Sequence, residues 1–261
     1  MPEVTKYAPG AFCWIELGTS DPEAAKRFYN QIFGWSAVDM PAAPDLIYTM
    51  LRKDEKDVGA LYKLKEEHKA EGVPPHWLSY ISVDSADETA KRAKELGGTV
   101  VMDPFDVFDV GRMAILQDPT GATFAIWQPR VHIGARVKDE PNTLCWNELG
   151  TNDTDKAREF YTKLFGWSSK TDESATPYTE FSNAGIPHGG MMKIAPEWGN
   201  VPPHWMPYFA VEDCDGTAGK AAGLGASTMV PPTDIPNVGR FAVLGDPQGA
   251  VFAIIKLTAR S

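Results

Sequence analysis

The stretch CWIELGTSDPEAAKRFYNQIFGW, residues 13–35, decides the fold because the chain contains it twice. Residues 145–167 read CWNELGTNDTDKAREFYTKLFGW and match it at 13 of 23 positions, at an offset of 132. Two further blocks repeat in the same order. VPPHW occurs at 73–77 and 201–205, and the 18 residues from Val110 match those from Val238 at 12 positions. A repeat this long exceeds a solenoid unit and indicates two duplicated domains.

The chain length agrees with a duplication. The 261 residues correspond to about 1.7 domains of roughly 150 residues, and either half is long enough to bury its own core. We place the first domain at residues 8–130 and the second at 140–258. A charged segment at 136–142, which contains Pro141, is the predicted linker.

Each half reads as strand, helix and three strands, and then the same again. Asp21 is expected to cap a helix whose apolar residues recur at helical spacing as far as Phe33, and Gly34 ends it. After three short strands the pattern restarts with a strand over 78–83, a helix over 86–96 and three more strands. Four βαβββ modules in one chain predict an α+β fold.

The composition of the chain limits the classes of molecule that it is expected to bind. The net charge is −10, with 35 acidic and 25 basic residues and no basic cluster, so nucleic acid and anionic membranes are excluded as partners. No apolar run approaches the roughly 20 residues of a membrane span. Three cysteines form no disulfide framework, and the first ten residues lack the apolar stretch of a signal peptide. We predict a cytoplasmic protein, either a monomer or a homodimer, whose partner is a small molecule.

The repeated motifs resemble a known superfamily. The βαβββ unit, the helix D-x-x-x-A-x-x-F-Y-x-x-x-F-G-W and the turn G-R-x-A-x-x-x-D-P-x-G-A are similar to those of the vicinal oxygen chelate superfamily, and the resemblance covers nearly the whole chain. That superfamily includes glyoxalase I, extradiol dioxygenases and bleomycin-resistance proteins. The resemblance implies two tandem glyoxalase-like domains, in which curved mixed sheets surround concave clefts and the helices lie outside.

The same resemblance bears on a metal cofactor. Metal-binding members carry ligands on the first, fifth and last strands of a half. The matching positions are Trp14, Leu78 and Ala125 in the first half, and Trp146, Met206 and Ala253 in the second. Tryptophan, leucine and alanine side chains cannot ligate a divalent ion. We therefore expect no metal bound in the usual way of the superfamily, and no other cofactor.

Strand alternation predicts which side chains face each cleft. The opposite face, including Cys13 and Ile15, is expected to pack under the helices. A cleft rich in aromatic side chains, with few polar groups, suits a flat or aromatic organic ligand. The predicted cleft residues are Trp14, Glu16, His76, Leu78, Tyr80, Ser82, Thr123, Ala125 and Trp127 in the first half, and Trp146, Glu148, His204, Met206, Tyr208, Ala210, Val251, Ala253 and Ile255 in the second.

Two acids and two histidines are the catalytic candidates. Glu16 and Glu148 are candidate general bases whose pKa burial would raise. Alternatively, each is a structural acid that binds a backbone N–H or an arginine. His76 and His204 follow Pro-Pro at a strand entrance. They are either acid–base groups, ligands of a non-standard metal site or rim residues.

The ligand-binding candidates are mostly aromatic. The two tryptophans, at 14 and 146, either stack on a ligand or fill a cavity left by the lost metal. Arg112 and Arg240 could clamp an anionic substrate, but we favour turn pairs with Asp118 and Asp246. The full set of ligand-binding candidates is Trp14, Tyr48, Tyr80, Trp127, Trp146, Tyr178, Met206 and Tyr208.

Three functions remain open. The first is metal-independent isomerisation, cyclisation or proton abstraction on a small organic molecule, and the second is sequestration of such a molecule without turnover. The third is a structural protein whose clefts are filled by its own side chains. The halves differ at Trp127 against Ile255, Ser82 against Ala210 and Thr123 against Val251. These differences predict two unequal sites, of which the second is less polar.

Overall fold

The computed structural model describes residues 3–43, 46–65, 67, 72–173 and 176–258. The predicted order of strand, helix and three strands is confirmed in all four modules. The elements of the first half are β1 (Phe12–Thr19), α1 (Pro22–Phe33), β2 (Ser36–Ala43), β3 (Leu46–Lys53), β4 (Lys56–Lys63), β5 (His76–Ser82), α3 (Ala86–Glu95), β6 (Thr99–Val107), β7 (Gly111–Gln117) and β8 (Thr123–Pro129).

The second half repeats this order and includes a 3₁₀ turn, η1. Its elements are β9 (Leu144–Thr151), α4 (Thr154–Phe165), β10 (Ser168–Asp172), β11 (Tyr178–Asn183), β12 (Ile186–Lys193), η1 (Pro196–Trp198), β13 (His204–Ala210), α5 (Cys214–Gly223), β14 (Ser227–Ile235), β15 (Gly239–Gly245) and β16 (Val251–Leu257).

The first helix of each half begins and ends at the residues that the sequence predicts. The Asp21 carboxylate accepts a hydrogen bond from the Ala24 backbone N–H at 3.0 Å, and Gly34 closes α1 in the left-handed conformation at φ 73°. Asp153 and Gly166 do the same for α4. The repeated Asp and Gly are therefore helix boundaries, and they set the angle at which each helix leaves its sheet.

Each half forms one curved, eight-stranded mixed sheet. The strand orders are β2-β3-β4-β1-β5-β8-β7-β6 and β10-β11-β12-β9-β13-β16-β15-β14. The two modules of a half join where β1 pairs antiparallel with β5, and where β9 pairs antiparallel with β13. Within modules, β1 pairs parallel with β4 and β5 with β8. The α+β class is confirmed, and the concave face of each sheet is built within one half.

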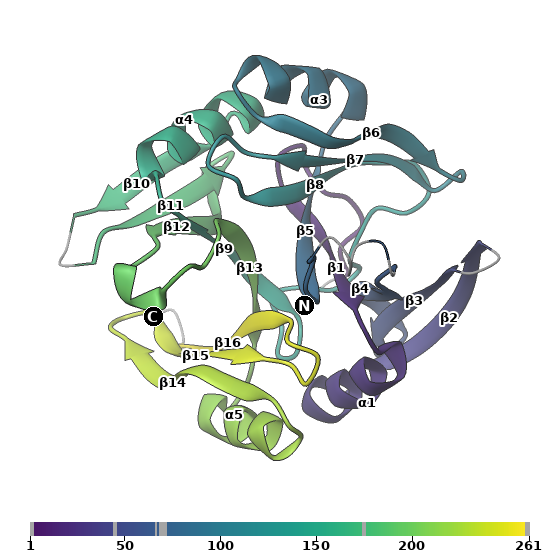
Figure 1. Cartoon of the computed structure of the whole chain (residues 1–261), viewed down its shortest axis with the longest axis vertical. Helices are drawn as coiled ribbons and strands as arrows, with labels where there is room; N and C mark the ends of the chain where they lie inside the picture. Colours follow the sequence, from purple (N-terminus) through teal and green to yellow (C-terminus); the bar gives the residue numbers. More distant parts are fainter. Residues whose placement is uncertain (1–2, 44–45, 66, 68–71, 174–175, 259–261) are drawn as a thin grey trace.

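The helices pack on strands of their own half and also meet across the halves. In Figure 1, α1 lies beside α5 and α3 beside α4, while β5 and β13 pass next to each other at the centre. One core joins the first-half helix α1 to second-half strands, and the Phe33 ring centroid lies 5.0 Å from that of Phe209. The other core joins α4 to first-half strands, with Phe124 6.2 Å from Phe160. The two halves therefore share both helix-covered cores.

A buried polar chain crosses between the halves twice. The Trp77 indole N–H donates to the Tyr29 hydroxyl at 3.1 Å, and that hydroxyl donates to Asp246 Oδ2 of the other half at 2.9 Å. The reciprocal chain is built from the equivalent residues. Trp205 donates to the Tyr161 hydroxyl at 2.7 Å, and Tyr161 donates to Asp118 Oδ2 at 2.9 Å. The repeated motifs Phe-Tyr, His-Trp and Asp-Pro-x-Gly therefore meet at the junction of the halves.

The expected pairs of Arg112 with Asp118 and of Arg240 with Asp246 are wrong. Arg112 binds Asp87, at the start of α3, and Asp106 at 2.7–3.1 Å. Arg240 binds Asp215 and Asp234 in the same way. The Asp118 carboxylate instead turns inward, where it accepts backbone N–H groups of its own turn and the Tyr161 hydroxyl. A buried acid is satisfied by these fixed donors, which leaves the arginine to the exposed acids.

None of the helices within the described residues has the length and apolar character needed to cross a membrane. Cys13, Cys145 and Cys214 are all free.

Candidate functional site

A hydrogen-bonded carboxylate lies on the concave face of the first sheet. Trp14 and Glu16 are two residues apart on β1 and therefore project from the same face. The Tyr48 hydroxyl, from β3, donates to Glu16 Oε2 at 2.7 Å, and the Trp14 indole N–H donates to the Tyr48 oxygen at 3.1 Å. Tyr80 of β5 also interacts with this carboxylate. Its hydroxyl lies 3.9 Å from Met113 Sδ, which is a weaker acceptor.

The second half builds the same group from the equivalent residues. The Tyr208 hydroxyl of β13 donates to Glu148 Oε1 at 2.9 Å. The Trp146 indole N–H donates to the Tyr178 hydroxyl at 2.9 Å, and Tyr178 also interacts with Glu148. We call each group of one tryptophan, two tyrosines and one glutamate a carboxylate centre. Sequence reasoning named all eight residues, but its structural alternative gave each acid a backbone or arginine partner, whereas the partners are phenols.

Burial dominates the electrostatics of both centres. It raises the pKa of Glu16 and of Glu148, and the hydrogen bonds from the tyrosines lower the pKa by less. Burial and the nearby carboxylate raise the pKa of Tyr48 and Tyr178 well above the usual value, so both hydroxyls stay protonated as donors. A carboxyl group with a raised pKa, held by neutral donors in an apolar setting, is suited to accept and return a proton.

The two histidines lie at the ends of the concave faces. His76 and His204 begin β5 and β13, and each ring Nδ1 lies 2.8 Å from the carbonyl oxygen of the proline two residues earlier. His204 also lies against Gly150, where a Cβ atom would be 3.2 Å from Cε1. Both rings are half-buried. This placement agrees with the rim position, and a catalytic role for either histidine stays a prediction.

The residues on the concave faces do not fit the metal of metal-binding members. Trp14 lies opposite Tyr80 on the neighbouring strand, and Tyr80 lies opposite Ala125. Of these three side chains, only the tyrosine has an oxygen atom that can ligate a metal. One carboxylate lies at the centre of each face, Glu16 or Glu148, and the side chains that donate to it are tyrosines. Across the described residues, no group of three or more His, Cys, Asp or Glu side chains is arranged to hold a metal ion. The expected lack of a metal cofactor stays a prediction.

A β-bulge corrects one residue of the predicted pattern. The register of β1 against β5 shifts between Phe12 and Trp14. As a result Cys13 lies with the concave-face residues, with its thiol 3.6 Å from the Tyr80 carbonyl oxygen, and not under the helices. Phe12 takes the helix-facing place, 5.0 Å from Trp205. Strict alternation fails here because a bulge adds one residue to the strand.

Sequence reasoning missed two residues that cover the first concave face. His132, in the segment after β8, lies edge-on to Trp14 with ring centroids 4.7 Å apart, and its carbonyl oxygen accepts the Trp127 indole N–H at 2.8 Å. Tyr7 is buried beside them and donates to the Ala135 carbonyl oxygen at 2.8 Å. Both residues lie outside the repeated blocks, so the repeat carried no signal for them.

The second concave face was expected to be the less polar one, but the outer strands of the second half carry charged residues. The replacements of Trp127, Ser82 and Thr123 make the central strands of the second face less polar than those of the first. The outer strands of the second face are more polar than those of the first. The concave-face positions Val38, Met40 and Met50 of β2 and β3 are occupied by charged residues in β10 and β11. The residues that replace them are Lys170, Asp172 and Glu180.

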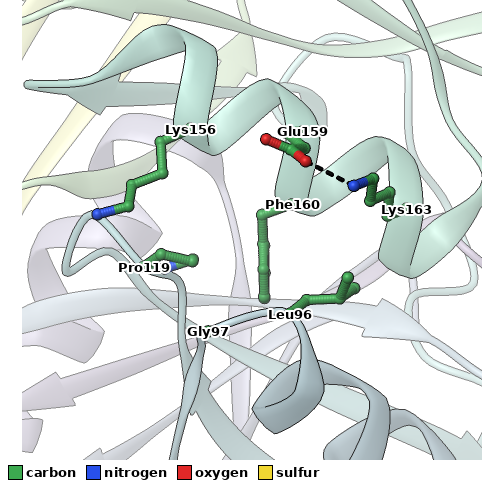
Figure 2. A pocket seen from close by; sticks show the side chains of 7 residues that line it. All are labelled: Leu96, Gly97, Pro119, Lys156, Glu159, Phe160 and Lys163. Atoms are coloured by element: carbon green, nitrogen blue, oxygen red, sulfur yellow. Dashed lines mark hydrogen bonds and ion pairs between the residues drawn. The ribbon is translucent and has the colours of Figure 1, made fainter.

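Two surface cavities lie away from both concave faces. One, of about 360 Å³, lies where α4 meets the end of α3 and the turn at Pro119 (Figure 2). Phe160 and Leu96 form its apolar part, and Lys163 pairs with Glu159 at 2.5 Å. The other, of about 440 Å³, is lined by charged residues of the β3–β4 turn and by Arg136. Neither contains a residue of a carboxylate centre.

Comparison with known proteins places this architecture in a family. The family model described as Glyoxalase/Bleomycin resistance protein/Dioxygenase superfamily matches residues 12–126 and 134–254. A Mycobacterium tuberculosis protein named "Putative glyoxylase CFP32" is 41% identical over 259 residues, which is 98% of each chain. The Streptomyces peucetius "Anthracycline biosynthesis protein DnrV" is 37% identical over 267 residues, or 97% of this chain and 96% of that protein.

A solved structure agrees at the level of the fold. The Mn(II)-bound glyoxalase from Novosphingobium aromaticivorans superposes with a TM-score of 0.66 at 14% identity, over 95% of this chain and 82% of that chain. The predicted resemblance is thus confirmed by a match to both halves and by relatives that span the full length. The chain belongs to the glyoxalase/bleomycin resistance protein/dioxygenase superfamily.

Proposed function

We propose that this protein binds a small, largely apolar or aromatic organic molecule on a concave face and catalyses a proton transfer within that molecule. The reaction proceeds without the usual metal of the superfamily. The observation that carries this proposal is the carboxylate centre. A glutamate with a raised pKa is held by tyrosine hydroxyls beside a tryptophan, on the strands where metal-binding members carry ligands. In this proposal the carboxylate takes the place of a metal as the reactive group.

The chemistry requires no oxidant or reductant. The Glu148 carboxylate accepts a proton from a carbon next to a carbonyl group, and the C–H electron pair passes into an enolate. A neutral phenol such as Tyr178 stabilises the enolate oxygen by hydrogen bonding. The protonated carboxyl then returns the proton to the same or a neighbouring carbon, which gives exchange or isomerisation. Glu16 and Tyr48 offer the same groups in the first half.

The relatives support the choice of ligand class. One is named for anthracycline biosynthesis and another as a glyoxylase, and both names concern small organic molecules. The apolar and aromatic side chains around each centre favour a flat ligand with few polar groups. His76 and His204, at the ends of the faces, are candidates for a second acid–base group in the same reaction.

The test follows α-proton exchange of 2-tetralone, an aromatic ketone, in D₂O by NMR. We expect the protein to accelerate exchange, and the double variant Glu16→Gln/Glu148→Gln to lose the acceleration by a factor of about 10²–10⁴. Affinity for the ketone should change by no more than a few fold. Glu159→Gln, which alters an exposed acid on α4, is the matched control. Equal exchange by the double variant and the unmodified protein would overturn the proposal.

A second candidate is sequestration without turnover. It is favoured by the hydrogen bond between Trp14 and Tyr48, which fixes an aromatic wall whether or not chemistry occurs. In that case the ketone binds with the same affinity to the unmodified protein and to the double variant, and neither accelerates exchange.

A further inference from the structure

We infer that the second concave face admits the ligand and that His132 closes the first. This inference rests on the proposed function, because it assigns the ligand of that function to one of the two carboxylate centres. It starts from a difference between equivalent residues. The Trp14 side chain is 3% exposed, whereas Trp146 is only partly buried. The two indoles make the same hydrogen bond to a tyrosine, so their own placement does not cause the difference.

The cover over Trp14 comes from the segment between the halves. His132 lies edge-on to Trp14 at 4.7 Å and to Trp127 at 5.9 Å, so one imidazole fills the space between two indoles. Burial lowers the pKa of His132, which keeps the ring neutral among these aromatic groups. The imidazole occupies the place where a flat ligand would stack on Trp14.

Hydrogen bonds hold this cover in place. We call residues 132–136 together with Tyr7 the strap. The strap is bonded to strands β1, β4 and β8 of the first half through backbone groups and one indole N–H, and the Tyr7 hydroxyl joins its two parts. The bonds are His132 N to Val110 O at 3.1 Å, Trp127 Nε1 to His132 O at 2.8 Å, Ala135 N to Cys13 O at 2.8 Å, Arg136 N to Asp57 O at 2.7 Å, Val4 N to Arg136 O at 2.9 Å and Tyr7 Oη to Ala135 O at 2.8 Å.

The second half lacks the anchor for such a strap. Ile255 replaces Trp127, which removes the indole N–H that holds the His132 carbonyl. The chain leaves β16 as it leaves β8, with Thr258 N bonded to Val238 O as Arg130 N is bonded to Val110 O. Within the part of the chain that the structure describes, no aromatic ring pairs with Trp146. Among the described residues, the second indole therefore has no such cover, and it stays partly exposed.

The surroundings of Trp146 indicate what it would bind. Phe241 and Val251 are also partly exposed and belong to the same apolar cluster as Trp146, while Lys170 and Glu180 lie opposite each other on β10 and β11 at the outer edge of the face. A flat aromatic molecule could stack on the indole, with a hydrogen-bond donor directed at the Glu148 carboxylate. The expected ligand of this site is thus an aromatic compound with at least one hydroxyl group.

The test is ¹⁹F NMR of the full chain labelled with 5-fluorotryptophan, with 2-naphthol as the probe. The eight tryptophan signals are assigned by single Trp→Phe variants. We expect 2-naphthol to shift the Trp146 signal saturably and to leave the Trp14 signal in place. In His132→Ala both signals should shift, because the cover is removed. In the control His132→Phe, which keeps a ring over Trp14, the Trp14 signal should stay in place.

Each outcome bears on the inference. A Trp14 shift in the unmodified protein, equal to or ahead of that of Trp146, overturns the inference and leaves the proposed function standing. A Trp14 signal that stays in place in His132→Ala shows that the strap does not close the first face. If neither signal moves in any variant, both the inference and the proposed ligand class are wrong. Unchanged positions of the Trp35, Trp77, Trp167, Trp198 and Trp205 signals, none of which comes from a ring paired with His132, confirm that the variants are folded.

Discussion

The two copies agree more closely at the junction between the halves than on the two concave faces. At the junction, equivalent residues make equivalent contacts, as the chains Trp77–Tyr29–Asp246 and Trp205–Tyr161–Asp118 show. On the concave faces the carboxylate centres match, but the outer strands and the side chains that cover each tryptophan differ. A reciprocal contact constrains both copies, because each residue must fit a partner in the other half. A face turned toward solvent carries no such constraint, so the two faces can take different roles.

The largest expected effect breaks the junction. Phe209 is fully buried, and its ring lies 5.0 Å from Phe33 of the other half. Phe209→Ala should lower the free energy of unfolding by about 3–5 kcal/mol, because it leaves a cavity in a shared core. Urea denaturation measures the loss. It should occur in a single transition for the whole chain, since both halves contribute to that core.

The control for this variant is Phe108→Ala. Phe108 is 68% exposed, so its removal should change the free energy of unfolding by no more than about 0.5 kcal/mol. If Phe209→Ala unfolded the second half alone, in a separate transition, the halves would be independent and the comparison would fail.

A smaller effect tests the reciprocity of the junction. Tyr161→Phe leaves Asp118 Oδ2 without its donor and the Trp205 indole N–H without an acceptor. The loss should be about 1–3 kcal/mol, the usual cost of unpaired buried polar groups. Tyr29→Phe is the matched variant in the other half and should lose a similar amount. A neutral result for one of the two would show that only one chain stabilises the junction.

The pH dependence of stability tests the role of the buried glutamate on the second concave face. Burial raises the pKa of Glu148, so the folded state favours the protonated carboxyl. The stabilising contribution of Glu148 is therefore present below the unfolded pKa of about 4.3 and is lost as the pH rises through the higher folded pKa. Glu148→Gln should have the higher melting temperature at neutral pH, and the difference should close in acid.

Calorimetry at several pH values checks this expectation, with Glu159→Gln as the control. The pair with Lys163 lowers the pKa of Glu159, so that variant should gain nothing at neutral pH. If Glu148→Gln is less stable than the unmodified protein at neutral pH, then Glu148 is a structural acid and the two regions are less different than we infer.

The smallest effect concerns the surface. Arg112 and Arg240 bind exposed acids in equivalent networks, far from the shared cores. Arg112→Gln and Arg240→Gln should each cause a small and similar loss of melting temperature, which disappears in about 1 M salt because exposed ion pairs are screened. A loss that persists at high salt in one variant would mean that this arginine also has a packing role.

The fold was largely predictable from the sequence because local signals and the repeat agree. Asp21 and Gly34 mark the ends of α1, and the equivalent residues mark α4. Alternation on β1 placed Trp14 and Glu16 on the concave face, and the repeat placed Tyr48 and Tyr178 at matching points. The same alternation misplaced Cys13, since a bulge has no signature in a hydrophobic pattern.

Other features of the site depended on long-range packing. The partners of Arg112 and Asp118 are set by which residue turns inward at the junction, and the strap brings His132 onto Trp14 from outside the repeated blocks. The polarity of the second face depended on β10 and β11, whose register relative to the centre is a property of the sheet.

By itself, the sequence determined the duplication, the four modules, the superfamily and the glutamate of each carboxylate centre. These features are carried by motifs and periodicities that act over a few residues, and the repeat displays them twice. Only the tertiary structure decided that helices of the two halves meet at the junction, that phenols hold both carboxylates, and that one tryptophan is buried while its counterpart is partly exposed. These contacts join residues 30 to more than 200 positions apart, where the partner is chosen by the packing of whole sheets and not by local pattern.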